Sequence, residues 1–100
     1  FNSTVYGGTK AAILAMTKSF ARHYAKYNIL VNNVAPGAVD TRMMRGSLAE
    51  DTLQGVIDTA PLKRLGDPME IANMIAYLCS PEASWVTGST VDVNGGTLMI

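Results

Sequence analysis

The distribution of apolar and polar positions predicts a helix, a strand, one or two short helices, another helix and a final strand. Residues 4–27 are rich in apolar side chains at helical spacing and predict one long helix. Residues 11–17 within it carry no charge, although a surface helix normally has a polar face. We therefore expect this run to be covered on more than one side. Ala11, Ala15 and Ser19 form a line of small residues that would let another helix approach closely.

A short β-branched run follows at residues 29–34. It does not alternate between apolar and polar positions, which is typical of a strand buried on both faces of a parallel sheet. Pro36 and Gly37 are expected to end it. In open parallel sheets, ligands bind at the carboxyl ends of strands, so residues 35–41 occupy the place of a ligand-binding loop. An ordinary turn that reverses the chain explains the local pattern equally well.

Residues 42–60 predict one or two short surface helices, which either cover a substrate site or form a loosely packed pair. The next helix, 68–80, has a clear start: Asp67 can cap it, Pro68 suits its first position, and Glu70 completes a capping box. Residues 90–93 predict the last strand.

Strands separated by helical crossovers indicate a parallel sheet in an α/β fold. Two strands are too few for a stable sheet. We therefore expect residues 1–100 to be half of an α/β fold. The missing half would precede Phe1, and the 100 residues alone would not fold stably.

The composition narrows the functional class. The chain is 48% hydrophobic and 16% charged, with eight basic and eight acidic residues, which is typical of a globular domain and gives no indication of nucleic acid or membrane binding. The single cysteine, Cys79, excludes an internal disulfide and fits a reducing, cytoplasmic location. We interpret Cys79 as a small buried apolar residue, Trp85 as a packing or interface residue, and His23 as a surface or packing residue rather than a metal ligand.

Tyr6 and Lys10 are the first candidates for catalysis. Residues four apart share one face of a helix, so the phenol and the ammonium can project side by side. A nearby cation lowers the pKa of a phenol from about 10. Lowering it to about 7 requires roughly 4 kcal/mol, and the tyrosine could then act as a general acid or base. The same spacing is common on ordinary helices.

Four stretches, taken in order, resemble the short-chain dehydrogenase/reductase family. They are Tyr6-x-x-x-Lys10, residues 33–41 (NVAPGAVDT), residues 61–72 (PLKRLGDPMEIA) and residues 87–96 (TGSTVDVNGG). Each motif alone is weak, but the four together, in this order and spacing, are specific. Within the family, the chain is most similar to the 3-oxoacyl-(acyl-carrier-protein) reductase type.

The resemblance implies that residues 1–100 are the C-terminal half of a Rossmann-like, doubly wound parallel sheet, with the N-terminal, dinucleotide-binding half before Phe1. It also implies an NAD(P)-dependent oxidoreductase that interconverts a carbonyl and a secondary alcohol. By the family's pattern, Tyr6 protonates the carbonyl oxygen during hydride transfer. Lys10 lowers the tyrosine pKa and binds the nicotinamide ribose.

The resemblance also implies a cofactor loop at Pro36, Gly37, Val39 and Thr41, with residues 42–60 binding substrate. The Val39 backbone and the Thr41 hydroxyl are the expected contacts with the nicotinamide end. The resemblance further implies dimers or tetramers assembled through helix 4–27 and through helix 68–80 with strand 90–93.

Parts of the family pattern are expected to lie before Phe1: the glycine-rich phosphate turn, the residue that selects NAD or NADP, and the catalytic serine. Ser3 is too close to Tyr6 to replace that serine. Two alternatives stay open, an NAD(P)-dependent epimerase or dehydratase with the same Tyr/Lys pair, and a non-catalytic association module. The sequence does not name the substrate or the direction of the reaction.

Overall fold

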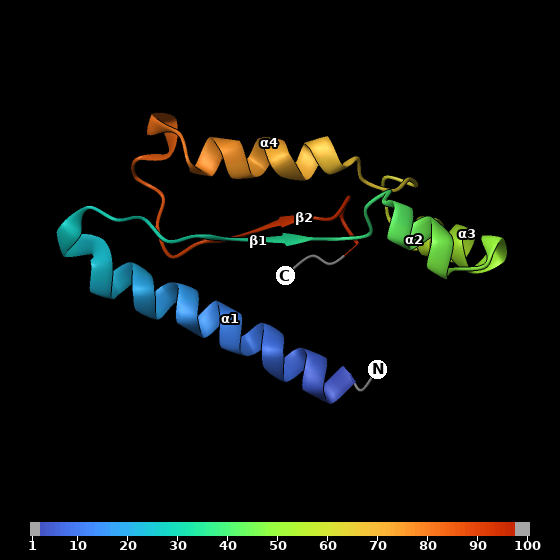
Figure 1. The fold of residues 1–100 in the computed structure, drawn as a ribbon, viewed down its shortest axis with the longest axis horizontal. Helices are drawn as coiled ribbons and strands as arrows, with labels where there is room; N and C mark the ends of the chain where they lie inside the picture. The colour runs from blue at the N-terminus through green and yellow to red at the C-terminus, as the bar shows by residue number, and fades with distance from the viewer. Residues whose placement is uncertain (1–2, 98–100) are drawn as a thin grey trace. The chain divides into compact units, whose positions relative to one another are not determined.

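A computed structural model describes residues 3–97, with the backbone alone for Ser3 and Tyr6. Its elements are α1 (Ser3–Tyr24), η1 (Ala25–Tyr27), β1 (Asn33–Pro36), α2 (Arg42–Ser47), α3 (Glu50–Thr59), α4 (Pro68–Leu78), η2 (Pro81–Ala83) and β2 (Thr90–Val93) (Figure 1). This is the predicted order of helices and strands. Within the described residues, no helix has the length and apolar character needed to cross a membrane.

The chain divides into two units. The first contains the residues up to 33 together with 78–91, and the second contains 34–77 together with the residues from 92 onward. Helix α1 lies in the first unit, whereas α2, α3 and the loop after β1 lie in the second. We describe each unit by itself.

The predicted long helix is confirmed, and its end has a local cause. After α1 the chain tightens into the 3-10 turn η1, which ends at Asn28 in the left-handed conformation with φ +60°. The Asn28 N–H donates to Ala25 O at 2.9 Å, and the Ile29 N–H donates to Tyr24 O at 3.3 Å. A left-handed residue of this kind satisfies the last carbonyls of a helix and stops it.

The expectation that residues 11–17 are covered on more than one side is wrong for the described chain. Only Thr17 of this run is buried, and Met16 is 51% exposed. Helix α1 is covered along a narrow line, because Ala21, 4% exposed, approaches Gly88: a Cβ on Gly88 would lie 3.4 Å from the Ala21 Cβ. The larger apolar side chains of the run lie away from that line.

The first strand begins and ends later than the predicted 29–34. Val31 and Asn32 lie beside the chain before β2, but side chains make several of the links: the Val31 N–H donates to Thr87 Oγ1 at 3.1 Å, and the Asn32 amide bonds Val86 O and the Ser89 N–H. These side-chain bonds replace a regular ladder. Regular pairing starts at Asn33, and Pro36 is the last residue of β1 rather than its terminator.

The two strands form a parallel sheet, as predicted. The Asn33 N–H donates to Ser89 O at 2.9 Å, and the Gly37 N–H donates to Val93 O at 2.9 Å. The pairing advances four residues along both strands, so they run in the same direction. The strand residues are half-buried or exposed. The expected burial of the first strand on both faces is therefore not found in the described residues.

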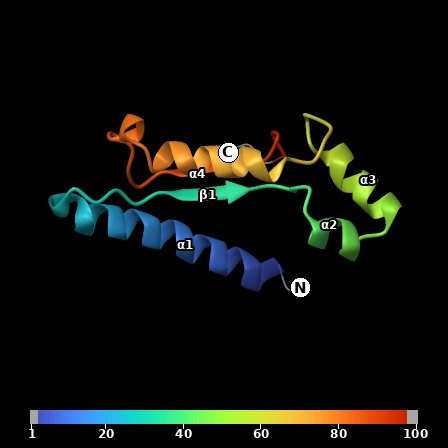
Figure 2. The same cartoon turned by 45° about the horizontal axis from the view of Figure 1, so that its top comes forward.

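The prediction of one or two short helices between residues 42 and 60 is confirmed, and the two helices are α2 and α3 (Figure 2). The predicted start of α4 is also confirmed. The Met69 N–H donates to Asp67 Oδ1 at 2.8 Å, and the Asp67 N–H donates to Glu70 Oε1 at 2.9 Å, which is a capping box. The helix ends at Leu78, two residues earlier than predicted.

One packing prediction fails after α4, because Cys79, expected to be buried, is exposed. Trp85, expected to be a packing or interface residue, is 98% exposed and so does not pack within the described chain. Both lie in the irregular chain between α4 and β2, where Ala83 is the fully buried residue. Apolar composition therefore did not identify which side chain fills this part of the unit.

Candidate cofactor and substrate site

The four predicted cofactor residues lie at the end of β1 and in the loop that follows it: Pro36 is the last strand residue, and Gly37, Val39 and Thr41 belong to the loop. The loop leaves the carboxyl end of β1 and enters α2, entirely within the second unit. Two neighbouring segments hold its backbone. One is the chain at the end of β2, and the other is the connection between α3 and α4.

Gly37 contacts the end of β2 without room for a side chain. Its N–H donates to Val93 O at 2.9 Å. A Cβ on Gly37 would lie 2.7 Å from the Asn94 Cβ and 2.8 Å from the Asn94 Cα. The structure therefore gives this glycine a packing role that holds whether or not a cofactor is bound.

Val39 pairs with Gly66 in an isolated parallel bridge. The Gly66 N–H donates to Ala38 O at 2.9 Å, and the Asp40 N–H donates to Gly66 O at 2.8 Å. These bonds use the peptide groups that flank Val39. In a bridge of this kind, the N–H and C=O of Val39 itself point to the side opposite Gly66. A ligand on that side could bond the Val39 backbone without breaking the bridge.

Thr41 is the N-cap of α2, a role that the sequence analysis missed. Its Oγ1 accepts a hydrogen bond from the Met44 N–H at 3.1 Å. A threonine directly before a helix was the signal that could have predicted the cap. A hydroxyl that accepts one bond can still donate its own hydrogen, so capping is compatible with a contact to a ligand.

Asp40 and Arg45 form an ion pair across the start of α2. Arg45 Nη2 donates to Asp40 Oδ2 at 3.0 Å, and its Nε donates to Oδ1. The hydrogen bonds from Arg45 hold the pKa of the Asp40 carboxyl below its usual value, and the same pair raises the pKa of Arg45. Sequence reasoning missed this pair because Asp40 precedes the helix and the five-residue spacing is not helical.

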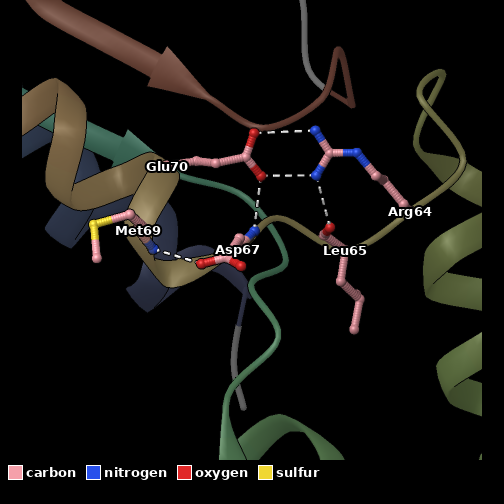
Figure 3. A network of polar contacts seen from close by, with 5 residues as sticks. All are labelled: Arg64, Leu65, Asp67, Met69 and Glu70. Carbon is pink, nitrogen blue, oxygen red and sulfur yellow. Dashed lines mark hydrogen bonds and ion pairs between the residues drawn. The ribbon is translucent and has the colours of Figure 1, made fainter.

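Arg64 and Glu70 form a second, two-pronged ion pair (Figure 3). Arg64 Nη1 lies 2.7 Å from Glu70 Oε1, and Nη2 lies 3.0 Å from Oε2. Oε1 also accepts the Asp67 N–H, and Nη1 donates to Leu65 O at 3.2 Å. The bonds from Arg64, and then the bond from Asp67, lower the pKa of Glu70 to about 2. The pKa of Arg64 is raised by the same pair. The sequence identified Glu70 only as a cap.

A cavity of about 290 Å³ lies within the second unit, beside Ala38 of the loop. Its walls come from α3, from the connection between α3 and α4, from the start of α4, and from β2 with the turn after it. Residues that represent these walls are Val56, Leu62, Arg64, Asn94 and Gly96. The mixture of apolar side chains with a charged pair and a glycine turn could accommodate a ligand with both apolar and polar parts.

Tyr6 and Lys10 both lie on α1, in the first unit. The helix is continuous through both positions, so the four-residue spacing places them on one face of it. The Tyr6 side chain lies outside the described part of the structure, and Lys10 is half-buried. The structure thus keeps the predicted residues in two groups, the α1 pair in one unit and the loop residues in the other.

One protein family and several known proteins are similar to this chain over nearly its whole length. The family described as enoyl-(acyl carrier protein) reductase matches residues 1–97. The chain is 43% identical over 97 residues to the 3-oxoacyl-(acyl-carrier-protein) reductase FabG of Vibrio harveyi, covering 97% of this chain and 39% of that protein. It is 44% identical over 95 residues to the FabG of Escherichia coli, covering 95% and 38%.

A solved structure is also similar to this chain. The crystal structure titled short-chain dehydrogenase/reductase SDR:glucose/ribitol dehydrogenase from Brucella melitensis matches with a TM-score of 0.84 and 46% identity, over 95% of this chain and 38% of that one. The chain belongs to the short-chain dehydrogenase/reductase family. It spans about two-fifths of the length of the curated relatives that it matches.

Proposed function

We propose that the protein carrying this chain is an NAD(P)-dependent oxidoreductase that reduces the 3-oxo group of an acyl thioester to a secondary alcohol. The observation that carries this proposal is the 43–44% identity, over 95 residues or more, to relatives named as 3-oxoacyl-(acyl-carrier-protein) reductases. The family motifs of the Tyr/Lys pair, the loop after β1 and the glycine turn after β2 support it.

In the proposed mechanism, Tyr6 is the proton donor. When bound, the dinucleotide would supply the hydride that the carbonyl carbon accepts, and the Tyr6 phenol would give its proton to the carbonyl oxygen. The phenolate that results regains a proton from water. Lys10 stabilises that phenolate, because a cation one helical turn away lowers the pKa of a phenol. By the family pattern, Lys10 also bonds the ribose of the dinucleotide.

The loop after β1 is the proposed binding site for the nicotinamide end of the dinucleotide. The Val39 peptide groups, which point away from Gly66, would bond the carboxamide, and the Thr41 hydroxyl would donate to it. Pro36 and Gly37 would set the path of the loop from β1. These residues fit the cofactor, since the bonds that fix Val39 and Thr41 leave their proposed contacts possible.

Helices α2 and α3 are the proposed substrate cover. Helix α2 begins directly after the cofactor loop, α3 follows α2 in the chain, and Met43 on α2 is 80% exposed. Methionine adapts to ligands of variable shape. Enoyl thioester reduction is a second candidate, because the matching family is described as an enoyl reductase. An epimerase or dehydratase is the third.

Purified full-length protein distinguishes these reactions. We would mix it with NADPH or NADH and either a 3-oxoacyl thioester or a 2-enoyl thioester, follow loss of the reduced nicotinamide, and identify the product by mass spectrometry. A 3-hydroxyacyl product is expected. A saturated product from the enoyl substrate would favour the second candidate. Turnover of neither substrate, with the dinucleotide bound but not consumed, would favour an epimerase or dehydratase.

We also propose that the protein is a homo-oligomer, assembled through α1 and through α4 with β2. Support comes from the apolar side chains left exposed on α1, among them Ile13, Met16 and Phe20 at 43%, 51% and 42%. Contiguous apolar surface of this kind usually marks an association site.

A further inference from the structure

Hydrogen bonds from Arg64 and Asp67 to Glu70 close the chain before α4 into a ring. Both carboxylate oxygens of Glu70 accept bonds from Arg64, and one of them also accepts the Asp67 N–H at 2.9 Å. Glu70 belongs to the first turn of α4, so residues 64–67 are tied to a helix end (Figure 3). Two parallel bonds between a guanidinium and a carboxylate fix orientation as well as distance.

Gly66 lies inside this ring, and its two peptide groups bond the cofactor loop. Its N–H donates to Ala38 O and its O accepts the Asp40 N–H, at 2.9 and 2.8 Å. Contact alone does not dictate its position, because a Cβ on Gly66 would meet its nearest atom, Ala38 O, at 3.7 Å. The place of Gly66 is therefore set by the conformation of residues 64–67.

We propose that Arg64 and Glu70 are positioning residues for the cofactor loop, acting through Gly66 on the peptide groups of Val39. The inference rests on the proposed function, because it takes the Val39 backbone as a nicotinamide contact. Every link is a bond in the second unit: Glu70 to Arg64 and Asp67, then Gly66 between them, then Ala38 and Asp40 on either side of Val39.

The simpler role for Glu70 is to cap α4, and one substitution separates the two. Glu70→Gln keeps an oxygen that can accept the Asp67 N–H, since glutamine also completes a capping box. It removes the charge and the second oxygen that make the two-pronged pair. Arg64→Met removes the other partner and leaves the cap untouched. Glu82→Gln is the matched control, because Glu82 is an exposed carboxylate of η2 in the first unit and is absent from the ring.

Steady-state kinetics of the full-length protein test the proposal. The free energy of an exposed ion pair typically changes an equilibrium constant by about two- to fivefold. We expect the KM for the reduced dinucleotide to rise by that amount in Glu70→Gln and in Arg64→Met, with kcat at saturating dinucleotide unchanged. The double variant should resemble the single variants, because both remove one interaction. Glu82→Gln should match the parent. Loss of folded protein alone would lower kcat and leave KM unchanged, which would overturn the proposal.

Amide hydrogen exchange is the readout that does not depend on activity. In Glu70→Gln, the Asp40 and Gly66 amides should exchange faster than in the parent, while the Asn33 and Gly88 amides of the first unit keep the parent's rates. Equal acceleration at all four amides would overturn the proposal. If the parent binds no dinucleotide, the proposed function fails and this inference fails with it. If the parent binds it and the KM values of both variants equal that of Glu82→Gln, this inference alone fails.

Discussion

Gly37 and Asn94 approach so closely that no side chain fits between them. A Cβ on Gly37 would lie 2.7 Å from the Asn94 Cβ, well inside van der Waals contact, and both atoms facing it are fixed near the backbone. The neighbouring bond from the Gly37 N–H to Val93 O, at 2.9 Å, holds the two chains at this separation. Gly37 of the cofactor loop thus also holds the end of β1 against the turn after β2.

Gly37→Ala in the full-length protein should therefore be destabilising. Overpacking of this kind typically costs about 1–3 kcal/mol. Gly55→Ala is the control, because nothing lies within 4 Å of that position inside α3, and alanine there should stabilise the protein by roughly 0.5–1 kcal/mol. Urea denaturation measures both. Equal stabilities for the two variants would show that the loop and Asn94 separate easily.

Tyr6→Phe removes the phenol hydroxyl, the proposed proton donor, and keeps the aromatic ring of the side chain. The turnover number should fall by about 10²–10⁴, the usual contribution of acid-base catalysis. Dinucleotide affinity, measured by fluorescence titration, should stay close to that of the parent. A turnover number within about threefold of the parent would exclude Tyr6 as the acid.

The Arg64–Glu70 pair predicts a pH dependence at the acid end. The pKa of Glu70 is lowered from its ordinary 4.5 to about 2 in the folded chain. Its contribution to stability is therefore fully present above pH 4.5 and is lost as pH falls toward 2. We expect the difference in unfolding free energy between the parent and Glu70→Gln to be constant at neutral pH and to shrink across that acid window. A constant difference at every pH would mean that the pair does not form in solution.

Thr41 is expected to serve both α2 and the cofactor. Thr41→Val removes the oxygen that accepts the Met44 N–H, and loss of such a cap typically costs about 1 kcal/mol. It also removes the proposed donor to the nicotinamide end, so the KM for the dinucleotide should rise. Thr41→Ser keeps the hydroxyl and should preserve both properties. If Thr41→Val loses stability with an unchanged KM, Thr41 is a cap and not a cofactor contact.

Local signals in the sequence predicted much of the fold. The Asp67 and Glu70 capping box and the bounds of the last strand at 90–93 were correct, because both depend on neighbours in the chain. The first strand was misplaced because the Asn32 amide bonds Val86 and Ser89, more than 50 positions away. No local pattern reports such a bond.

The candidate site was predictable only in part. Motif resemblance identified the loop residues, but not the reason that Gly37 is glycine, since Asn94 is distant in sequence. The Arg64–Glu70 and Asp40–Arg45 pairs were missed for a related reason. Their partners lie across a helix start, where neither helical nor strand periodicity predicts which side chains meet.

Helix α1 leads to the last prediction, which concerns assembly. Ile13, Leu14 and Met16 are 43%, 38% and 51% exposed in the described chain, and the run 11–17 has no charge that would make its exposure to water favourable. Two-fold pairing would place α1 of one subunit against its copy, with Ala15 among the small residues that permit close approach.

Ala15→Arg would place a charge in that seam without a partner, and burying an unpaired charge is costly. Light scattering on the full-length variant should therefore show a smaller species than the parent. Thr52→Arg, at an exposed position of α3, should keep the parent's mass and controls for the added charge. An unchanged mass and unchanged stability for Ala15→Arg would mean that this face of α1 meets water, or another part of its own protein, rather than a second copy.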